Sequence, residues 1–180
     1  MQNASIRPAE VRDAAAISHV HVQSWLTTYK GLVPDQFLAS LNGAERAPEW
    51  ERWLKRDISA LVAEIDGELV GFAAGGAIRE PLDAYDAELY TIYLLERAQG
   101  RGIGKVLLTS VAEALVRKGH RSLMVWVLEQ NPAVSFYARA GAQYLKSKQV
   151  EIGGVRLPEV ALGWPEAGSL FASTGDTASD

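Results

Sequence analysis

The chain has no cysteine among its 180 residues. This absence excludes disulfides, thiolate metal ligands and a cysteine nucleophile. The sequence also lacks an apolar run of about 18 residues and an apolar N-terminal region, so neither a transmembrane helix nor a secretion signal is expected. Together these absences predict a cytoplasmic protein.

Positive charge is not in excess either, because the formal net charge is -4 and the pI is about 5.4. This balance argues against nucleic acid or an anionic membrane as a partner, and it is compatible with an amine substrate. A chain of 180 residues that is 48% hydrophobic is expected to form one domain. We assign that domain to residues 1–164 and expect residues 165–180, rich in Gly, Ala, Ser, Thr and Asp, to be disordered.

The periodicity of apolar residues predicts helices in the first third of the chain and alternating strands and helices after it. Asp66-Gly67 between two strand-like runs is typical of a tight hairpin. Polar residues around Pro81 predict a loop over residues 79–86. The expected strands are 5–7, 60–65, 68–74, 88–95, 122–128, 143–152 and 155–163, and the expected helices start near residues 9, 35, 42, 105 and 132.

A glycine-rich segment lies between an apolar strand and a helical pattern. The backbone N–H groups at the start of a helix bind anions, and glycine lets that backbone approach a ligand closely. The side chains of Arg101 and Lys105 supply positive charge to balance a bound anion. The segment therefore predicts a phosphate or pyrophosphate site. Its residues are Gln99, Gly100, Arg101, Gly102, Ile103, Gly104 and Lys105.

The spacing of these glycines does not match two common phosphate-binding motifs. A Walker A loop has four residues between its glycines and a Ser or Thr after the lysine, whereas Gly100 and Gly104 enclose three and Val106 follows Lys105. A dinucleotide fingerprint reads G-x-G-x-x-G, whereas this loop reads G-x-G-x-G. The segment instead has the pattern Gln99-x-x-Gly102-x-Gly104, which neither motif contains.

This pattern closely resembles the pyrophosphate-binding motif of the GNAT superfamily of acyl-CoA-dependent N-acyltransferases. The resemblance covers residues 4–164 and is most specific over residues 88–141. It implies an α/β (α+β) fold with a twisted, mostly antiparallel sheet of six to seven strands flanked by helices. In that fold, the strand before the glycine loop and the strand after the next helix splay apart and hold the cofactor.

The resemblance also implies the contacts of the cofactor, acetyl-CoA. Backbone groups of Ile92, Tyr93 and Leu94 would pair with the pantetheine amides, as a peptide adds to a free strand edge. The family commonly has an Asn near the end of the next strand, for which Asn131 is the candidate. Gln130 is the alternative residue, and the alternative role of Asn131 is to cap the helix that begins at Pro132.

Acyl transfer to an amine requires a base for the amine and an acid for the leaving thiolate. Glu88 lies eleven residues before Gln99, where family members that use a glutamate base carry it. Strand alternation predicts that Tyr90 and Ile92 share its face. The alternative is a solvated glutamate at the start of a strand.

Tyr137 is the candidate acid. Residues 136–142 resemble the family's Phe-Tyr-x-x-x-Gly-Phe segment, with Ala142 in place of the last aromatic. The tyrosine of that segment lies beside the thioester sulfur, and the alternative is a half-buried core tyrosine. With no cysteine available, direct transfer in a ternary complex is favoured, and the resemblance assigns the oxyanion to a backbone N–H near Leu94.

We expect the acceptor to meet the N-terminal helices, with Trp25, Tyr29, Glu88 and Tyr90 as substrate-binding residues. The alternative for Trp25 and Tyr29 is packing in the core. No metal is expected, because His19 and His21 are two residues apart on a helix and face different directions.

The sequence thus predicts an N-acetyltransferase that moves the acetyl group of acetyl-CoA to a primary amine of a small molecule or a protein. Two alternatives remain. The chain could be a catalytically silent acyl-CoA-binding regulator, or an interaction module whose glycine loop holds an anion. A homodimer is compatible with each, since the apolar hairpin over residues 150–164 offers strand surface.

Overall fold

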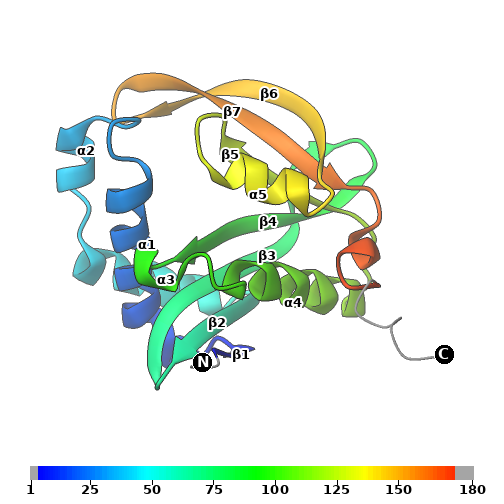
Figure 1. Ribbon diagram of the computed structural model, residues 1–180, viewed down its shortest axis with the longest axis horizontal. Coiled ribbons are helices and arrows are strands. Elements are labelled where there is room, and N and C mark those ends of the chain that lie inside the picture. The colour runs from blue at the N-terminus through cyan, green and yellow to red at the C-terminus, as the bar shows by residue number, and fades with distance from the viewer. Residues whose placement is uncertain (1–3, 173–180) are drawn as a thin grey trace.

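A computed structural model describes residues 4–172 and contains one seven-stranded sheet in the order β1-β2-β3-β4-β5-β7-β6 (Figure 1). Neighbouring strands are antiparallel except for β4 and β5, which are parallel. This confirms the predicted mostly antiparallel mixed sheet. The strands are β1 (Ser5–Pro8), β2 (Ser59–Ile65), β3 (Glu68–Leu82), β4 (Tyr85–Leu94), β5 (Leu123–Leu128), β6 (Gln143–Ile152) and β7 (Val155–Trp164).

Helices cover both faces of the sheet. One face is buried by α4 and α5, whose Leu107, Val111 and Tyr137 belong to the largest apolar cluster. The other face packs on α1 and α3, through Ile17 and Trp50. Among the described residues, no helix is long and apolar enough to cross a membrane. The helices are α1 (Ala14–Thr28), α2 (Asp35–Ala39), α3 (Gly43–Leu54), α4 (Ile103–Arg117) and α5 (Ala133–Arg139), with short 3-10 helices η1 (Val11–Asp13), η2 (Glu96–Ala98) and η3 (Ala167–Leu170).

The predicted loop over residues 79–86 is wrong, because β3 continues to Leu82 and β4 already begins at Tyr85. The polar composition of this segment misled the prediction. Its charged side chains have partners outside the segment, since Arg79 pairs with Glu88 on β4 and Glu80 with Lys148 on β6. Tertiary ion pairs therefore let a polar segment extend the hairpin.

The predicted disordered tail is wrong for its first part. Residues 167–170 form η3, in which Ala167 is 1% exposed and its N–H donates to the carbonyl of Arg121. Phe171 packs against the main apolar cluster. Residues 173–180 lie outside the described residues. Two apolar side chains and one backbone hydrogen bond thus fix a segment whose composition suggested a linker.

A bulge in β4 changes which side chains face the site. Thr91 lies opposite Ala74 and Leu89 opposite Gly75, so Tyr90 is an extra residue on β4. Leu89 and Ile92 consequently pack in the same apolar cluster, three positions apart. Glu88 alternates with Leu89 and points to the other face. The prediction that Glu88 and Ile92 share a face is therefore wrong.

The parallel strands β4 and β5 pair over only three residues each. Their register joins Ala87 to Leu123, Glu88 to Met124 and Leu89 to Val125. Beyond this point β4 stays paired with β3 as far as Leu94, and β5 stays paired with β7 as far as Leu128. The two strands therefore diverge, which confirms the predicted splay and leaves one edge of β4 unpaired.

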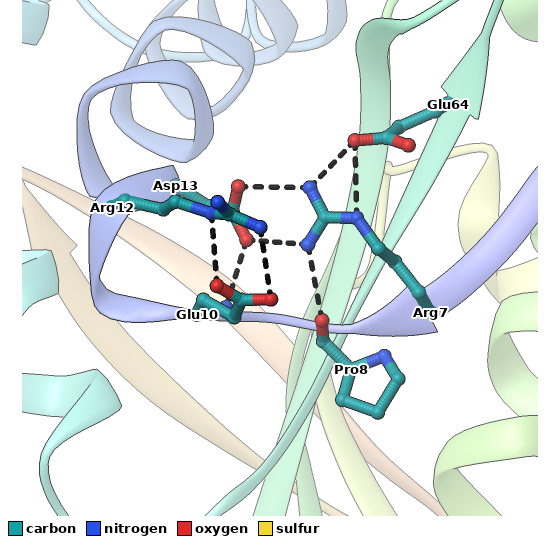
Figure 2. Close-up of polar contacts among 6 residues, drawn as sticks. All are labelled: Arg7, Pro8, Glu10, Arg12, Asp13 and Glu64. Carbon is teal, nitrogen blue, oxygen red and sulfur yellow. Dashed lines mark hydrogen bonds and ion pairs between the residues drawn. The ribbon is translucent and has the colours of Figure 1, made fainter.

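A partly buried ion-pair network ties the N-terminal strand to its neighbours (Figure 2). Arg7 donates to both oxygens of Asp13 at 2.7 and 2.9 Å and to Glu64 at 2.6 and 3.1 Å. Asp13 also accepts the backbone N–H of Glu10 at 2.8 Å. The Arg7 contacts hold the pKa of Asp13 below its usual value. One guanidinium therefore connects β1, the start of α1 and β2.

Replacing Arg7 by Met leaves the carboxylate of Asp13, whose side chain is 9% exposed, without its cation. We expect the free energy of unfolding to fall by about 2–4 kcal/mol at pH 7. Because the folded pKa of Asp13 is lowered, this contribution is present above its unfolded pKa of about 3.9 and is lost as the pH falls through the folded value. Urea unfolding at pH 7 and pH 3 measures both effects.

Arg12→Met is the matched control, because the Arg12 side chain is 75% exposed and pairs with Glu10 at the surface. Its expected change is within about 0.5 kcal/mol. A difference between wild type and Arg7→Met that is the same at pH 3 and pH 7 would contradict the role assigned to the Asp13 carboxylate.

Candidate active site

A cleft of about 640 Å³ opens where β4 and β5 diverge. Its walls come from four parts of the chain: the end of α1, the end of β4, the glycine loop with the start of α4, and the start of α5. Of the predicted cofactor-binding residues, those that line it are Ile92, Tyr93, Leu94, Gln99, Gly100, Gly102, Gly104, Lys105 and Asn131. The structure thus brings together in one cleft segments that are far apart in sequence.

The glycine loop ends in the first turn of α4. Gly102 has φ 80° and stands at the N-terminal cap of the helix, and Gly100 has φ 70°. Both angles lie in the left-handed region, where a side chain costs roughly 1 kcal/mol or more. The N–H groups of the first helical residues, Ile103 to Lys105, have no carbonyl one turn earlier to bond. This arrangement presents an anion site to the cleft.

Two of the predicted cofactor-binding residues in the glycine loop are not among those that line the cleft. Ile103 is 5% exposed and packs in the main cluster, so only its backbone N–H is available to a ligand. Arg101 is exposed and is not among the residues that line the cleft. Gln99 donates from Nε2 to the carbonyl of Leu94 at 3.1 Å, which fixes the loop against the end of β4.

Asn131 has the capping role considered for it, and its contact with the cofactor stays a prediction. Its Oδ1 accepts the N–H of Ala133 at 2.8 Å, which is the capping interaction. Its Nδ2 donates to the hydroxyl of Tyr29 at 3.1 Å, and the side chain lines the cleft. Gln130 does not belong to the lining of the cleft. The cap therefore orients an amide beside the diverging strands.

Glu88 is buried, with 2% of its side chain exposed, and its carboxylate is bound by Arg79. The guanidinium contacts both oxygens at 2.5–3.2 Å, and the backbone N–H of Arg79 donates to Oε2 at 3.1 Å. Arg79 also stacks 4.6 Å above the ring of Tyr90, whose hydroxyl donates to the carbonyl of Ala77. The carboxylate predicted as the base thus has a cation as its immediate partner.

The sequence did not indicate a second partly buried carboxylate, Glu159. Glu159 lies on β7 opposite Leu128, and its side chain is 19% exposed. Lys148 approaches it at 3.9 Å while bonding Glu80 at 2.8 Å and lying 4.0 Å from the ring centroid of Trp126. Burial raises the pKa of Glu159. Alternation along β7 places Glu159 on the face opposite to Val160 and Leu162, which belong to the main apolar cluster. No sequence motif indicates this residue.

Tyr137 is 3% exposed and belongs to the main apolar cluster. Its ring makes edge contacts with Phe136 and Trp164, at centroid distances of 5.2 and 6.0 Å. Burial raises the pKa of its hydroxyl, so the group is protonated at neutral pH. Phe136 rather than Tyr137 is among the residues lining the cleft. Tyr137 therefore lies behind the wall of the cleft, beside Phe136.

Tyr29, directly after α1, is 6% exposed and packs in the core, which is the alternative considered for it. Its ring packs against Trp25 at 4.5 Å between centroids, and the indole N–H of Trp25 donates to the hydroxyl of Tyr93 at 2.9 Å. His21 stacks on Tyr93 at 5.0 Å, and burial lowers its pKa to about 4. These rings form a buried polar cluster next to the cleft.

The sequence matches a known protein family and a known bacterial protein. The model of the acetyltransferase (GNAT) family matches residues 23–142. The chain is 42% identical over 168 residues to YuaI of Bacillus subtilis (strain 168), an uncharacterised N-acetyltransferase, covering 92% of this chain and 95% of that protein.

Solved structures share the fold. The PaiA N-acetyltransferase of Thermoplasma acidophilum, in complex with coenzyme A, is 26% identical with a TM-score of 0.65 and covers 87% of this chain and 98% of that one. An N-acetyltransferase of Staphylococcus aureus Mu50 is 22% identical with a TM-score of 0.72 and covers 92% of this chain and 99% of that one. With the family match over residues 23–142 and the YuaI similarity, these findings show that the chain belongs to the acetyltransferase (GNAT) family.

Proposed function

We propose that this protein transfers the acetyl group of acetyl-CoA to a primary amine. The observation that carries the proposal is the cleft between β4 and β5, which joins an unpaired strand edge to a helix N-terminus. An extended ligand with amides at one end and a pyrophosphate at the other matches both features. The coenzyme A bound to the PaiA relative supports the choice of ligand.

In this proposal the pantetheine arm pairs with the backbone of Ile92 to Leu94, and the pyrophosphate lies on the N–H groups that follow Gly102. The amine attacks the thioester directly in a ternary complex. Tyr137 donates a proton to the departing thiolate of CoA, because burial keeps its phenol protonated. A backbone N–H near Leu94 stabilises the oxyanion of the tetrahedral intermediate.

We assign the base to Glu88, which takes the amine proton directly or through a water. Arg79 fixes the position of this carboxylate by binding both of its oxygens. The proposed substrate-binding residues are Glu88 and Tyr90 on β4, Trp25 on α1 and Tyr29 directly after α1. The acceptor is an amine of a small molecule or of a protein.

The proposal also covers the extent of the domain, its location in the cell and its pairing with a second chain. Residues 1–164 act as one acetyltransferase domain in the cytoplasm, and two chains pair through the β6–β7 hairpin. A catalytically silent acyl-CoA-binding regulator remains the alternative function, and an interaction module that holds only an anion is a further one.

Acetyl-CoA is expected to stabilise the protein far more than inorganic phosphate does. At about 100 times its dissociation constant a ligand adds about 2.7 kcal/mol, which corresponds to a rise in Tm of about 5–10 °C for a chain of this size. Gly104→Leu places a side chain next to Leu94 and Phe136 in the cleft and should abolish most of this rise. Differential scanning fluorimetry measures it.

Gly104→Ala is the control for that variant, since a Cβ there meets its neighbours at ordinary contact distances of 3.4 Å or more. It should fold normally and keep a large part of the acetyl-CoA effect. Equal shifts with phosphate and with acetyl-CoA would favour the anion-holding module instead.

Tyr137→Phe is expected to lower kcat by about 100-fold or more while the KM for acetyl-CoA changes little, because only the proton donor is removed. Release of free CoA thiol with a panel of primary amines gives both constants. Tyr144→Phe is the control, because Tyr144 is 62% exposed on β6. A silent regulator would bind acetyl-CoA in both variants and turn over no amine in either.

The pH dependence of kcat/KM tests Glu88. A carboxylate that acts as the general base gives the profile an acid limb. Glu88→Gln should remove that limb and lower kcat by about 100-fold. Exposed Glu151→Gln on β6 is the control. A limb that survives Glu88→Gln and disappears in Glu159→Gln would assign the base to Glu159.

A further inference from the structure

Arg139 is a cation on the wall of the cleft that has no assigned role. It is the last residue of α5, and it lines the cleft together with Lys105 of α4. Arg139 is exposed, and in the described part of the chain no hydrogen bond or ion pair joins its guanidinium to another residue. A guanidinium has a permanent positive charge and five N–H donors. Arg139 therefore offers the cleft an anion-binding group.

One face of α5 forms the wall on which Arg139 lies. The residues of this helix that line the cleft are Ala133, Phe136 and Arg139. They are three positions apart, so their side chains lie on one face of the helix. A helix rises 1.5 Å per residue, which places Arg139 about 9 Å along the axis from Ala133. The wall thus extends from a point just after β5 to a cation at its far end.

The start of α4 lies directly beside this wall (Figure 1). A Cβ on Gly104 would meet the ring of Phe136 at 3.6 Å, so the glycine loop contacts α5 one turn before Arg139. Gly104 and Lys105 line the same cleft. The cleft therefore has two separate sources of positive potential. One is the N-terminus of α4 with Lys105, and the other is Arg139 on α5.

The lining of the cleft is more basic than the chain as a whole. Of the described residues that line it, Lys105 and Arg139 are the cations and Glu96 is the carboxylate. The N-terminus of α4 adds roughly half a positive charge. The whole chain, in contrast, has a formal net charge of -4. The positive potential of the cleft is therefore a local feature, and it favours an anionic ligand.

CoA has two anionic parts, a pyrophosphate and a phosphate on the 3′ carbon of its ribose. In the proposed function the pyrophosphate lies on the N–H groups at the start of α4. Arg139 lies on the neighbouring helix and is the cation that this placement leaves without a ligand. The planar fork of a guanidinium binds two oxygens of one phosphate at once, which suits a terminal phosphate group.

We propose that Arg139 binds the 3′-phosphate of CoA. The inference rests on the proposed function for the identity of the ligand and for the position of its pyrophosphate. It adds a specificity-determining residue to the site. The contact makes the protein select an acetyl thioester of CoA over the same acetyl group on a carrier that lacks the 3′-phosphate.

The test compares the binding of CoA and of 3′-dephospho-CoA, which differ by this phosphate alone. Isothermal titration calorimetry on the whole chain gives both dissociation constants. We expect the wild type to bind CoA about tenfold more tightly than dephospho-CoA. Arg139→Met keeps an unbranched side chain but removes the charge. It should raise the Kd for CoA to that for dephospho-CoA and leave the Kd for dephospho-CoA unchanged.

Two further variants show whether the effect belongs to Arg139. Arg117→Met is the matched control, because Arg117 is 70% exposed, pairs with Glu113 and does not line the cleft. It should match the wild type with both ligands. Lys105→Met removes a charge next to the proposed pyrophosphate position, so it should weaken CoA and dephospho-CoA by the same factor and keep the preference for CoA.

The inference is overturned if the wild type binds the two ligands equally. It is also overturned if Arg139→Met weakens both by the same factor, or if Lys105→Met removes the preference and Arg139→Met keeps it. Failure of the proposed function is a distinct outcome, because the wild type would then bind neither ligand. Tm values of the unliganded variants within a few degrees of the wild type exclude a general loss of structure.

Discussion

The divergence of β4 from β5 is the constraint on which the rest of the site depends. The two strands share three paired residues each and then separate, while each stays bonded to its other neighbour. Backbone groups on the free edge of β4 need partners, and a ligand with amides can supply them. The glycine loop follows the same strand, so the free edge leads directly to the N-terminus of α4.

The bulge at Tyr90 decides which side chains of β4 lie on each face of the sheet. It reverses the alternation of β4 once, so that Glu88 and Tyr93 lie on the face of α1 while Leu89 and Ile92 both pack under α4. The Tyr90 side chain lies over Gly76, where a Cβ would meet its hydroxyl at 2.6 Å. One extra residue thereby puts a carboxylate and a phenol on the side from which an acceptor can arrive.

On that side, several polar groups have fixed partners. Arg79 binds Glu88 within the β3–β4 hairpin, Lys148 reaches from β6 to Glu80 on β3, and Asn131 at the end of β5 binds Tyr29 directly after α1. Among these residues, Asn131 lines the cleft, so its hydrogen bonds to Tyr29 and Ala133 fix that part of the wall.

The sequence by itself determined the order of strands and helices, the Asp66-Gly67 hairpin and the anion-binding character of the glycine loop, because turn residues and periodicity act locally. It also indicated Glu88 and Tyr137 as candidates through a motif. Only the tertiary structure decided that β3 extends to Leu82 and β4 begins at Tyr85, that Ile92 faces away from Glu88, and that Glu159 is partly buried beside Lys148. The physical reason is that a bulge or an ion pair is defined by its partner on another strand, which local patterns do not encode.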